Sequence, residues 1–281
     1  MKKKIAVMSD KGGVAKTTTA VHIAGWAARM HGRTLFIDCD PKADATSAWI
    51  GFEAAHGNDP GATLYHVLCE KNVSPEDVIQ TVPLRYQRRP SKFTVDLIRS
   101  HVSMKAANVA LMNMLGRELK LANWLRQVED RYDYVVMDCL PDSQNLITIN
   151  ALMAADELVI PVEPEPYAMV GMKMLLNMME QVSEARQAAR MVPLKLRGIV
   201  PVKFRSNLTM HREALEALNK AYPNMVLTAV PDRTVVPQAA QAQMDLFAYE
   251  SSNWSDVTRA MSEMAEQVLL EPQPLETAEP I

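Results

Sequence analysis

The stretch KIAVMSDKGGVAKTTTA, residues 4–20, joins a short apolar run to a glycine-containing loop and then to a segment of helical character. A buried strand that leads through a tight loop into a helix is the typical setting of a phosphate-binding loop, whose strict pattern is G-x-x-x-x-G-K-[ST]. This stretch departs from the pattern twice, because Asp10 and Ala15 stand where the pattern has glycine. A second lysine, Lys11, opens the loop at a place where the pattern requires none.

The loop nevertheless keeps the residue types that phosphate binding needs. Gly12 and Gly13 let backbone amides turn toward an anion, and the start of the following helix adds partial positive charge. Lys16 is placed to reach terminal phosphates, and Thr17 is the expected magnesium ligand. We expect Ala15 to have a negative φ, which an alanine adopts without strain. The alternative is a chance Gly-Gly turn beside a surface lysine, which the strand–loop–helix context disfavours.

The rest of the chain alternates between apolar runs and segments of helical period. Strands are predicted in the runs KIAVMS, TLFIDCD, FTVDLI, YDYVVMDC, DELVIPVE, LRGIVPV and NMVLTAV. Most of these runs are continuous, which is typical of strands buried on both faces. Helices are predicted over residues 16–30, 167–190 and 208–221, with a last helix from about Ser252. This order predicts an α/β fold with a doubly wound, mostly parallel sheet flanked by helices.

The predicted domain organisation is simple. Residues 1–270 are expected to form a single domain, in which residues 51–105 read as loops and short helices at the sheet edge. The Pro-rich, acidic tail EPQPLETAEPI, residues 271–281, is expected to be disordered. The N-terminal apolar run is too short for a signal peptide, and no apolar stretch approaches the ~20 residues of a membrane span. We therefore expect a cytoplasmic protein.

The charge and the cysteine content of the chain limit which partners and which metal or disulfide sites are expected. The formal net charge is −3, so any contact with nucleic acid needs a local basic patch. The three cysteines, Cys39, Cys69 and Cys139, are widely spaced and odd in number, which argues against a disulfide framework or a zinc site. Cys39 and Cys139 follow predicted strands, and we expect buried, inert thiols there rather than ligands of a metal cluster.

Acidic residues end two of the predicted strands. Asp138 closes YDYVVMDC, the arrangement in which a carboxylate holds a metal ion near bound phosphates. Asp38 and Asp40 end TLFIDCDP and lie two residues apart, so they point to the same side of an extended chain. Each could instead be an ordinary helix cap or loop acid. Because ligands bind beyond the carboxyl ends of parallel strands, we expect these acids to lie near the loop.

Taken together, these motifs resemble the ParA/MinD family of ATPases over about residues 3–270. KGGVAKTT is similar to the family's deviant Walker A motif K-G-G-x-x-K-[ST], and FIDCDPKADAT is similar to its D-x-D-P-Q motif. VVMDCLPDSQNLITINALMAAD resembles the Walker B and switch II segment, and PVEPEPYAMVGM resembles the segment after it. VPVKFRSNLTMHREAL and TAVPDRTVVPQAA continue the match. Within the family, the chain is most similar to the small ParA partition ATPases without an N-terminal DNA-binding domain.

The resemblance implies roles for individual residues. It implies ATP and Mg²⁺ as cofactors, with Lys11 reaching the nucleotide of the other subunit in a sandwich dimer and Asp40 positioning the attacking water. The implied nucleotide contacts are Gly12, Gly13, Val14, Ala15, Lys16, Thr17, Thr18, Pro231 and Asp232, of which the last two would lie near adenine. Thr17, Asp38 and Asp138 would surround the magnesium ion. Leu140-Pro141-Asp142 departs from the family's usual Pro-Pro, which affects nucleotide sensing rather than ATP binding.

A basic stretch offers the local patch that DNA binding needs. Residues 193–212 hold five basic residues and no acid, namely Lys195, Arg197, Lys203, Arg205 and Arg212. ParA proteins carry basic residues for sequence-independent DNA binding in this region, and contacts to phosphate require charge rather than a base code. The alternative is an ordinary solvated surface. Residues 83–95 are also basic and form a second, weaker candidate.

The sequence therefore predicts a slow ATPase that positions a plasmid or chromosome. ATP would form a homodimer, the dimer would bind non-specific double-stranded DNA, and a ParB-like adaptor would trigger hydrolysis and release. The protein would then be nucleoid-associated, without membrane binding, because the acidic tail differs from a basic amphipathic lipid-binding helix. The alternatives are a non-DNA cargo, such as a microcompartment or protein cluster, and a metabolic ATP-dependent ligase of the same superfamily.

Overall fold

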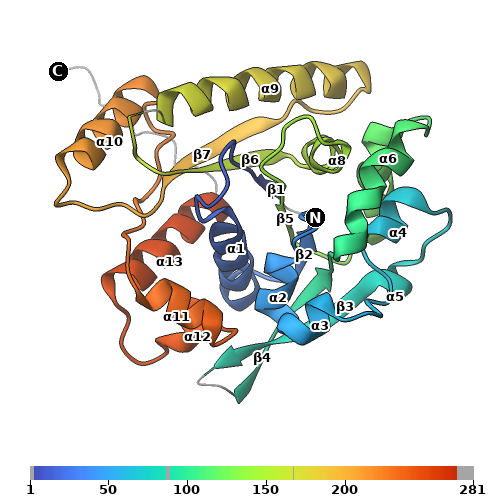
Figure 1. The fold of residues 1–281 in the computed structure, drawn as a ribbon, viewed down its shortest axis with the longest axis horizontal. Helices are drawn as coiled ribbons and strands as arrows, with labels where there is room; N and C mark the ends of the chain where they lie inside the picture. The colour runs from blue at the N-terminus through green and yellow to red at the C-terminus, as the bar shows by residue number, and fades with distance from the viewer. Residues whose placement is uncertain (1–2, 87–88, 167, 271–281) are drawn as a thin grey trace.

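The fold is built on a central sheet of seven strands, seen in Figure 1 in a computed structural model that describes residues 3–86, 89–166 and 168–270. The strand order is β3-β4-β2-β5-β1-β6-β7. The strands are β1 (Lys3–Val7), β2 (Thr34–Asp38), β3 (Ile79–Tyr86), β4 (Arg89–Ile98), β5 (Tyr134–Asp138), β6 (Glu157–Val162) and β7 (Lys195–Pro201). Every neighbouring pair is parallel except β3 and β4. This confirms the predicted α/β fold with a doubly wound, mostly parallel sheet.

Helices cover both faces of the sheet. Those that pack on one face are α1 (Lys16–Met30), α2 (Asp44–Ile50), α11 (Val235–Gln241), α12 (Leu246–Tyr249) and α13 (Asp256–Leu269). Those on the other face are α4 (Leu64–Cys69), α6 (Lys105–Met112), α7 (Lys120–Leu125), α8 (Leu146–Ala154), α9 (Ala168–Ala188) and α10 (Thr209–Ala221). Two short helices, α3 (Phe52–His56) and α5 (Pro75–Val78), lie in the connection between β2 and β3.

The core has two layers because each buried strand supplies alternate side chains to the two faces. Leu35 and Ile37 of β2 join the cluster under α4 to α10, while Phe36 between them joins the cluster under α1 and α13. All three side chains are fully buried. This confirms the interpretation of the continuous apolar runs as strands buried on both faces.

The region 51–105 contains a strand that the sequence analysis missed. Short helices lie there as predicted, but Ile79–Tyr86 forms β3, antiparallel to β4 at the edge of the sheet. Val82 and Leu84 are buried, whereas Pro83 and Arg85 are exposed. This alternation, rather than a continuous apolar run, is typical of a half-buried edge strand, where a proline is tolerated.

The predicted strand at residues 224–230 is wrong. The segment runs beside β7, with Leu227 N–H donating to Ile199 O at 2.8 Å and Val230 N–H donating to Pro201 O at 2.7 Å. The ladder is irregular between these two bonds, because Val230 rather than Ala229, the next residue in a regular parallel ladder, donates to Pro201 O. Only isolated bridges therefore connect this part of the described chain to the sheet.

The last helix begins later than predicted. It starts at Asp256 rather than near Ser252. Of the apolar stripe expected from the sequence, Val257, Met261, Met264 and Val268 are buried in the helix, whereas Trp254 lies before it and is only partly buried. The Glu250 carboxylate accepts hydrogen bonds from Ser255 N–H at 3.1 Å and from Ser255 Oγ at 2.6 Å. These bonds hold residues 250–255 as a turn in front of the helix. The predicted disordered tail, residues 271–281, lies outside the described residues, and no helix among those described is long and apolar enough to cross a membrane.

A buried histidine connects the first turn of α1 to α12. The His22 ring donates from Nδ1 to Thr18 O at 2.7 Å and accepts at Nε2 from Leu246 N–H at 3.0 Å. Acceptance at Nε2 requires the neutral ring. Burial lowers the pKa of His22, and this effect outweighs the opposing charge of Asp245.

The buried His22 is expected to make the fold sensitive to acid. The unfolded chain protonates a histidine near pH 6.5, whereas folded His22 stays neutral, so the stability it contributes is lost as pH falls below that value. His22→Gln should lose less stability than wild type between pH 8 and pH 5, measured by urea unfolding at each pH. The matched control is His56→Gln at a partly exposed histidine, and equal pH slopes for wild type and His22→Gln would contradict the assignment.

Candidate phosphate-binding site

The glycine-containing loop follows β1 at the switch point of the sheet. β1 pairs with β5 on one side and β6 on the other, and the chain goes from β1 toward β2 on the first side and later crosses from β5 to β6 on the second. The loop joins β1 to α1 at the carboxyl ends of the parallel strands, where ligands of such sheets bind. Val14 is buried against the core, while Lys11, Gly12 and Gly13 are exposed. Backbone amides and the α1 N-terminus are thus available to an anion from outside.

The conformation of Ala15 differs from the prediction. Its φ is +54°, in the left-handed region, as is that of Gly13 at +81°. The loop enters α1 through this left-handed residue, which explains why the strict pattern has glycine there. An alanine in this conformation costs about 1–2 kcal/mol relative to its preferred region. The expectation of a negative φ is therefore wrong, and the loop holds a small local strain at its junction with the helix.

Lys16, Thr17 and Asp138 form one buried cluster. Lys16 Nζ makes a direct ion pair with Asp138, and Thr17 Oγ1 donates to the other oxygen of the same carboxylate at 2.7 Å. Burial acts to lower the pKa of Lys16, but the charge and the hydrogen bond of Asp138 together outweigh burial, so the pKa is raised. The lysine is therefore charged. β5 carries Asp138 directly beside β1, which brings the two distant motifs together.

The donor chemistry of Thr17 and Asp138 fits a magnesium ion. Mg²⁺ prefers hard oxygen ligands, keeps several waters and usually takes only one or two protein ligands in phosphate sites. Among the described residues there is no group of three or more His, Cys, Asp or Glu side chains able to enclose a metal ion. A hydroxyl and a carboxylate next to a phosphate-binding loop match the mode of binding in which substrate phosphates complete the shell.

Asp38 lies beside Asp138 but is already engaged. The two residues are register partners on β2 and β5. One oxygen of Asp38 accepts from Thr46 N–H at 2.8 Å and Thr46 Oγ1 at 2.7 Å, and the other accepts from Asp40 N–H at 3.1 Å. Burial, with the charge of Asp138, raises the pKa of Asp38 to about 7. Asp38 therefore braces α2 and Asp40 in this structure. Thr46, which sequence reasoning missed, is its main partner.

Asp40 faces a cavity next to the loop. It lines a space of about 240 Å³ together with Gly12, Lys16, Thr17 and Pro141. One of its oxygens accepts from Lys42 N–H at 2.9 Å. The predicted catalytic carboxylate, the predicted phosphate lysine and the predicted metal ligand thus border the same space. Thr18 belongs to the first turn of α1, and its carbonyl accepts from His22.

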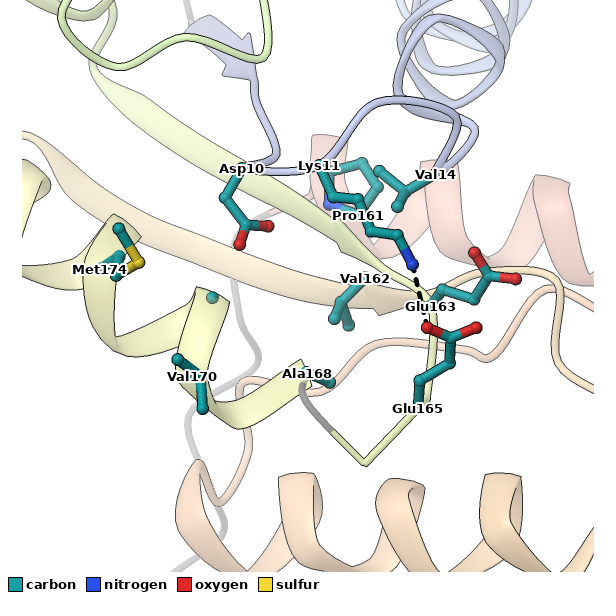
Figure 2. Close-up of a pocket in the computed structure, with 11 residues that line it drawn as sticks. Asp10, Lys11, Val14, Pro161, Val162, Glu163, Glu165, Ala168, Val170 and Met174 are labelled. Atoms are coloured by element: carbon teal, nitrogen blue, oxygen red, sulfur yellow. Dashed lines mark hydrogen bonds and ion pairs between the residues drawn. The ribbon is translucent and has the colours of Figure 1, made fainter.

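Lys11 is the exposed lysine of the loop. Figure 2 shows its ammonium group directed toward Glu165, with Nζ 2.9 Å from Oε2. The Lys11 side chain is 59% exposed, and the charge and hydrogen bond of Glu165 raise its pKa. Both residues line a cavity of about 360 Å³ between the loop and α9. Sequence reasoning missed Glu165, although an acidic residue just after a strand that borders the loop was the available signal.

The five predicted DNA-binding residues do not share one surface. Lys195 and Arg197 lie at the start of β7, about 20 Å along the strand from the residues that follow its end. Arg197 is only 9% exposed at its side chain, and its guanidinium donates to Val268 O at 2.9 Å and to two other carbonyls at the end of α13. Arg197 therefore caps that helix. We therefore leave Arg197 out of the proposed DNA-binding surface, because its donors are used within the fold.

The other three basic residues lie beyond the end of β7. Lys203 Nζ is 3.6 Å from Glu163, and Arg205 Nε donates to Asp232 at 2.7 Å. Arg212 on α10 donates only to Ser206 O and Thr209 Oγ1, so its charge has no acidic partner among the described residues. Pro231 and Asp232 lie beside Phe204 at this same edge of the sheet. We call Lys203, Arg205 and Arg212 the α10 basic group.

The buried cysteines behave as predicted from their surroundings. Cys39 and Cys139 are fully buried, and all three cysteines are free thiols. Burial raises the pKa of Cys139 to about 12 and raises that of Cys39 well above its usual value. Such thiols stay protonated and unreactive at neutral pH.

Comparison with known proteins agrees with the site. A family model described as an AAA domain, AAA_31, matches residues 2–191. The chain is 33% identical to the sporulation initiation inhibitor protein Soj of Bacillus subtilis, over 84% of this chain and 86% of that protein. It is 34% identical to the cell division protein PomZ of Myxococcus xanthus, over 88% of this chain and 72% of that protein.

A solved structure extends the comparison. Cobyrinic acid a,c-diamide synthase from Mycobacterium smegmatis, with a bound ATP analog and magnesium, superposes with a TM-score of 0.74 at 25% identity. The match covers 95% of this chain and 93% of that one. These matches extend over most of the chain and agree with the two-lysine loop and with the acids at the ends of β2 and β5. The chain belongs to the ParA/MinD family of P-loop ATPases.

Proposed function

We propose that this protein is a slow, Mg²⁺-dependent ATPase that positions cargo by switching between a monomer and an ATP-bound homodimer. ATP would bind on the loop amides from Gly12 to Thr18, with Lys16 on its phosphates. Thr17 and Asp138 would hold the magnesium ion, and Asp38 would hold Asp40 in place rather than touch the metal. The observation that carries this proposal is one loop with two lysines, of which Lys16 is buried and Lys11 is exposed.

The chemistry would be phosphoryl transfer to water by positioning and charge neutralisation. Magnesium, when bound, neutralises charge that develops on the transferred phosphoryl group. Lys16 would leave Asp138 partly or wholly to contact the phosphates. Asp40, at the rim of the cavity with its backbone held by Asp38, would orient the attacking water. Slow turnover is expected because the described residues around the cavity offer the carboxylates of Asp40 and Asp44 but no stronger general base.

Lys11 would make ATP binding in one subunit depend on the presence of the other subunit. Its side chain is exposed at the mouth of the loop, and its partner Glu165 is itself 39% exposed, so the pair can exchange for a phosphate of a facing subunit. Exposed ion pairs contribute only about 0–1 kcal/mol. A desolvated lysine–phosphate contact in a dimer interface outweighs that loss.

The cargo we propose is DNA, a plasmid or chromosome, released when a ParB-like adaptor stimulates hydrolysis. The dimer would hold non-specific double-stranded DNA with the α10 basic group, in the cytoplasm and on the nucleoid. A dimer doubles the group, so ATP would control DNA affinity. The similarity to PomZ supports the alternative of another positioned cargo with the same cycle.

The DNA proposal predicts that charge on one specific surface controls binding. Arg205→Gln with Arg212→Gln should weaken ATP-dependent DNA binding at least about tenfold and lower the salt dependence by about one unit per lost contact. The measurement is anisotropy with a random-sequence duplex at several salt concentrations. Lys195→Gln, an exposed lysine at the opposite end of β7, is the matched control. Binding that is equal without ATP, or unchanged in the double variant, would contradict the proposal.

A metabolic ligase remains the second candidate because of the similarity to the synthase. That function predicts turnover that depends on a small carboxylate-bearing substrate and ignores DNA. Turnover measured with and without DNA and adaptor therefore separates the two functions in one assay. Stimulation by DNA with adaptor supports the positioning ATPase.

A further inference from the structure

A third lysine borders the cavity beside the loop. The space of about 240 Å³ is lined by Lys11, Lys16 and Lys42 and by two carboxylates, Asp40 and Asp44. Lys42 stands where the motif D-x-D-P-Q has glutamine. Lys42 thus adds a positive charge to the cavity wall that a glutamine would not supply. Lys42 lies in the connection between β2 and α2, outside the phosphate-binding loop.

A tight turn fixes the position of Lys42. Ala43 N–H donates to Asp40 O at 2.9 Å, which closes a turn through Pro41 and Lys42, and Lys42 N–H donates to the Asp40 carboxylate at 2.9 Å. Proline favours the first central position of such a turn, and an aspartate at its start caps the backbone. Ala43 is fully buried and has a φ of +55°, so the surrounding structure determines the turn closely. The Asp40 carboxylate, which faces the cavity, therefore holds the backbone of Lys42 at the cavity wall.

Of the three lysines that line the cavity, Lys42 is the one whose ammonium group is available to bind an anion. Lys16 pairs with Asp138 and Lys11 pairs with Glu165. Within residues 3–86, 89–166 and 168–270, the Lys42 ammonium has neither an ion pair nor a hydrogen bond, and the residue is exposed. An anion that enters the cavity meets this charge without first displacing a carboxylate.

The position of the cavity indicates which part of a nucleotide it receives. It lies at the ends of β2 and β5, with Asp40 and the switch residue Pro141 in its wall. The predicted adenine contacts, Pro231 and Asp232, lie beside β7, on the other side of β1 in the sheet. A nucleotide laid across the loop therefore turns its terminal phosphate toward Asp40 and Lys42.

We propose that Lys42 binds the terminal phosphate of ATP and makes the site distinguish ATP from ADP. This inference rests on the proposed ATPase function and adds a specificity-determining residue to it. The charge of Lys42 meets a phosphate that ADP lacks, so its contribution appears with triphosphate alone. Lys16, by contrast, lies at the loop and contributes to both nucleotides.

The test compares two nucleotides in four forms of the full chain. Calorimetric titration with Mg²⁺ and either a non-hydrolysable ATP analog or ADP is carried out on wild type, Lys42→Gln, Lys42→Arg and Lys71→Gln. Lys42→Gln should bind the ATP analog about fivefold more weakly or worse, while its ADP affinity changes less than twofold. Lys42→Arg should restore the preference, and Lys71→Gln, at an exposed lysine between α4 and α5, should resemble wild type.

Other outcomes overturn the assignment. Equal loss for both nucleotides would mean that Lys42 only supports the turn, and unchanged affinity for both would mean that its charge does not reach the phosphate. If wild type binds neither nucleotide, the ATPase proposal fails, and this inference fails with it. If wild type binds both and Lys42→Gln matches it, the inference fails alone.

Discussion

Lys16→Ala is expected to lower ATP turnover at least about a hundredfold, because removal of one preorganised cationic donor from a phosphoryl-transfer site costs that much or more. Its ammonium belongs to the first residue of α1 and contacts the carboxylate predicted to hold magnesium. ATP binding should weaken together with turnover. The measurement is phosphate release at saturating Mg²⁺, with nucleotide binding followed by calorimetry.

The Lys16 experiment needs a control for folding, since the substitution leaves Asp138 buried without its cation. Breaking a buried pair in this way typically costs about 3–5 kcal/mol of stability. Lys16→Gln keeps a hydrogen-bond donor near Asp138 and tests the same loss of charge in a less damaging way. Lys4→Ala, at a lysine of β1 that pairs with Asp156 at 3.2 Å, is the matched control. Normal turnover in a folded Lys16 variant would show that the loop assignment is wrong.

Lys11→Ala is expected to abolish the ATP-dependent dimer while the monomer still binds nucleotide within a few-fold of wild type. The side chain is 59% exposed and its pair with Glu165 is at the surface, so the fold should tolerate the change. Turnover should fall with the dimer, because the proposed cross-subunit contact is lost. Sedimentation or light scattering with a non-hydrolysable ATP analog measures the dimer, and calorimetry measures binding.

Two further variants are needed to interpret the result for Lys11→Ala. Lys71→Ala removes an exposed lysine away from the loop and should dimerise normally. Glu165→Gln frees Lys11 from its partner within the subunit and should leave the dimer intact or stronger. A Lys11→Ala protein that dimerises and hydrolyses ATP like wild type would remove the cross-subunit role.

Most of the strands that were predicted correctly are continuous apolar runs, and burial on both faces leaves that signature whatever the neighbouring strand is. The two errors in the sheet have different causes. β3 alternates in polarity and contains Pro83, so it lacks the signature, whereas residues 224–230 carry it but pair with β7 irregularly, because Val230 rather than Ala229 donates to Pro201 O. The first error comes from the sequence pattern, and the second comes from how the segment pairs with β7.

The loop was predictable for a related reason. Lys16-Thr17 after a buried strand and before a helix is a local arrangement, and phosphate binding depends on local backbone amides and on the helix terminus. The conformation of Ala15 was not predictable in the same way. Its sequence neighbours allow either sign of φ, and the folded loop holds Ala15 in the left-handed region.

The sequence by itself determined the sheet class, the phosphate-binding loop and the acids beside it, because burial periodicity and strand-end position are local properties of the chain. Only the tertiary structure decided what each charged side chain does. Arg197 and Arg212 look alike in a basic stretch, yet Arg197 caps α13 and Arg212 has no acidic partner in the part of the chain that the structure describes. Lys11 meets Glu165 across 154 positions, whereas Lys42, at a cavity wall, has no ion pair with any described residue. Ion pairs join residues that are distant in the chain, so no local pattern encodes them.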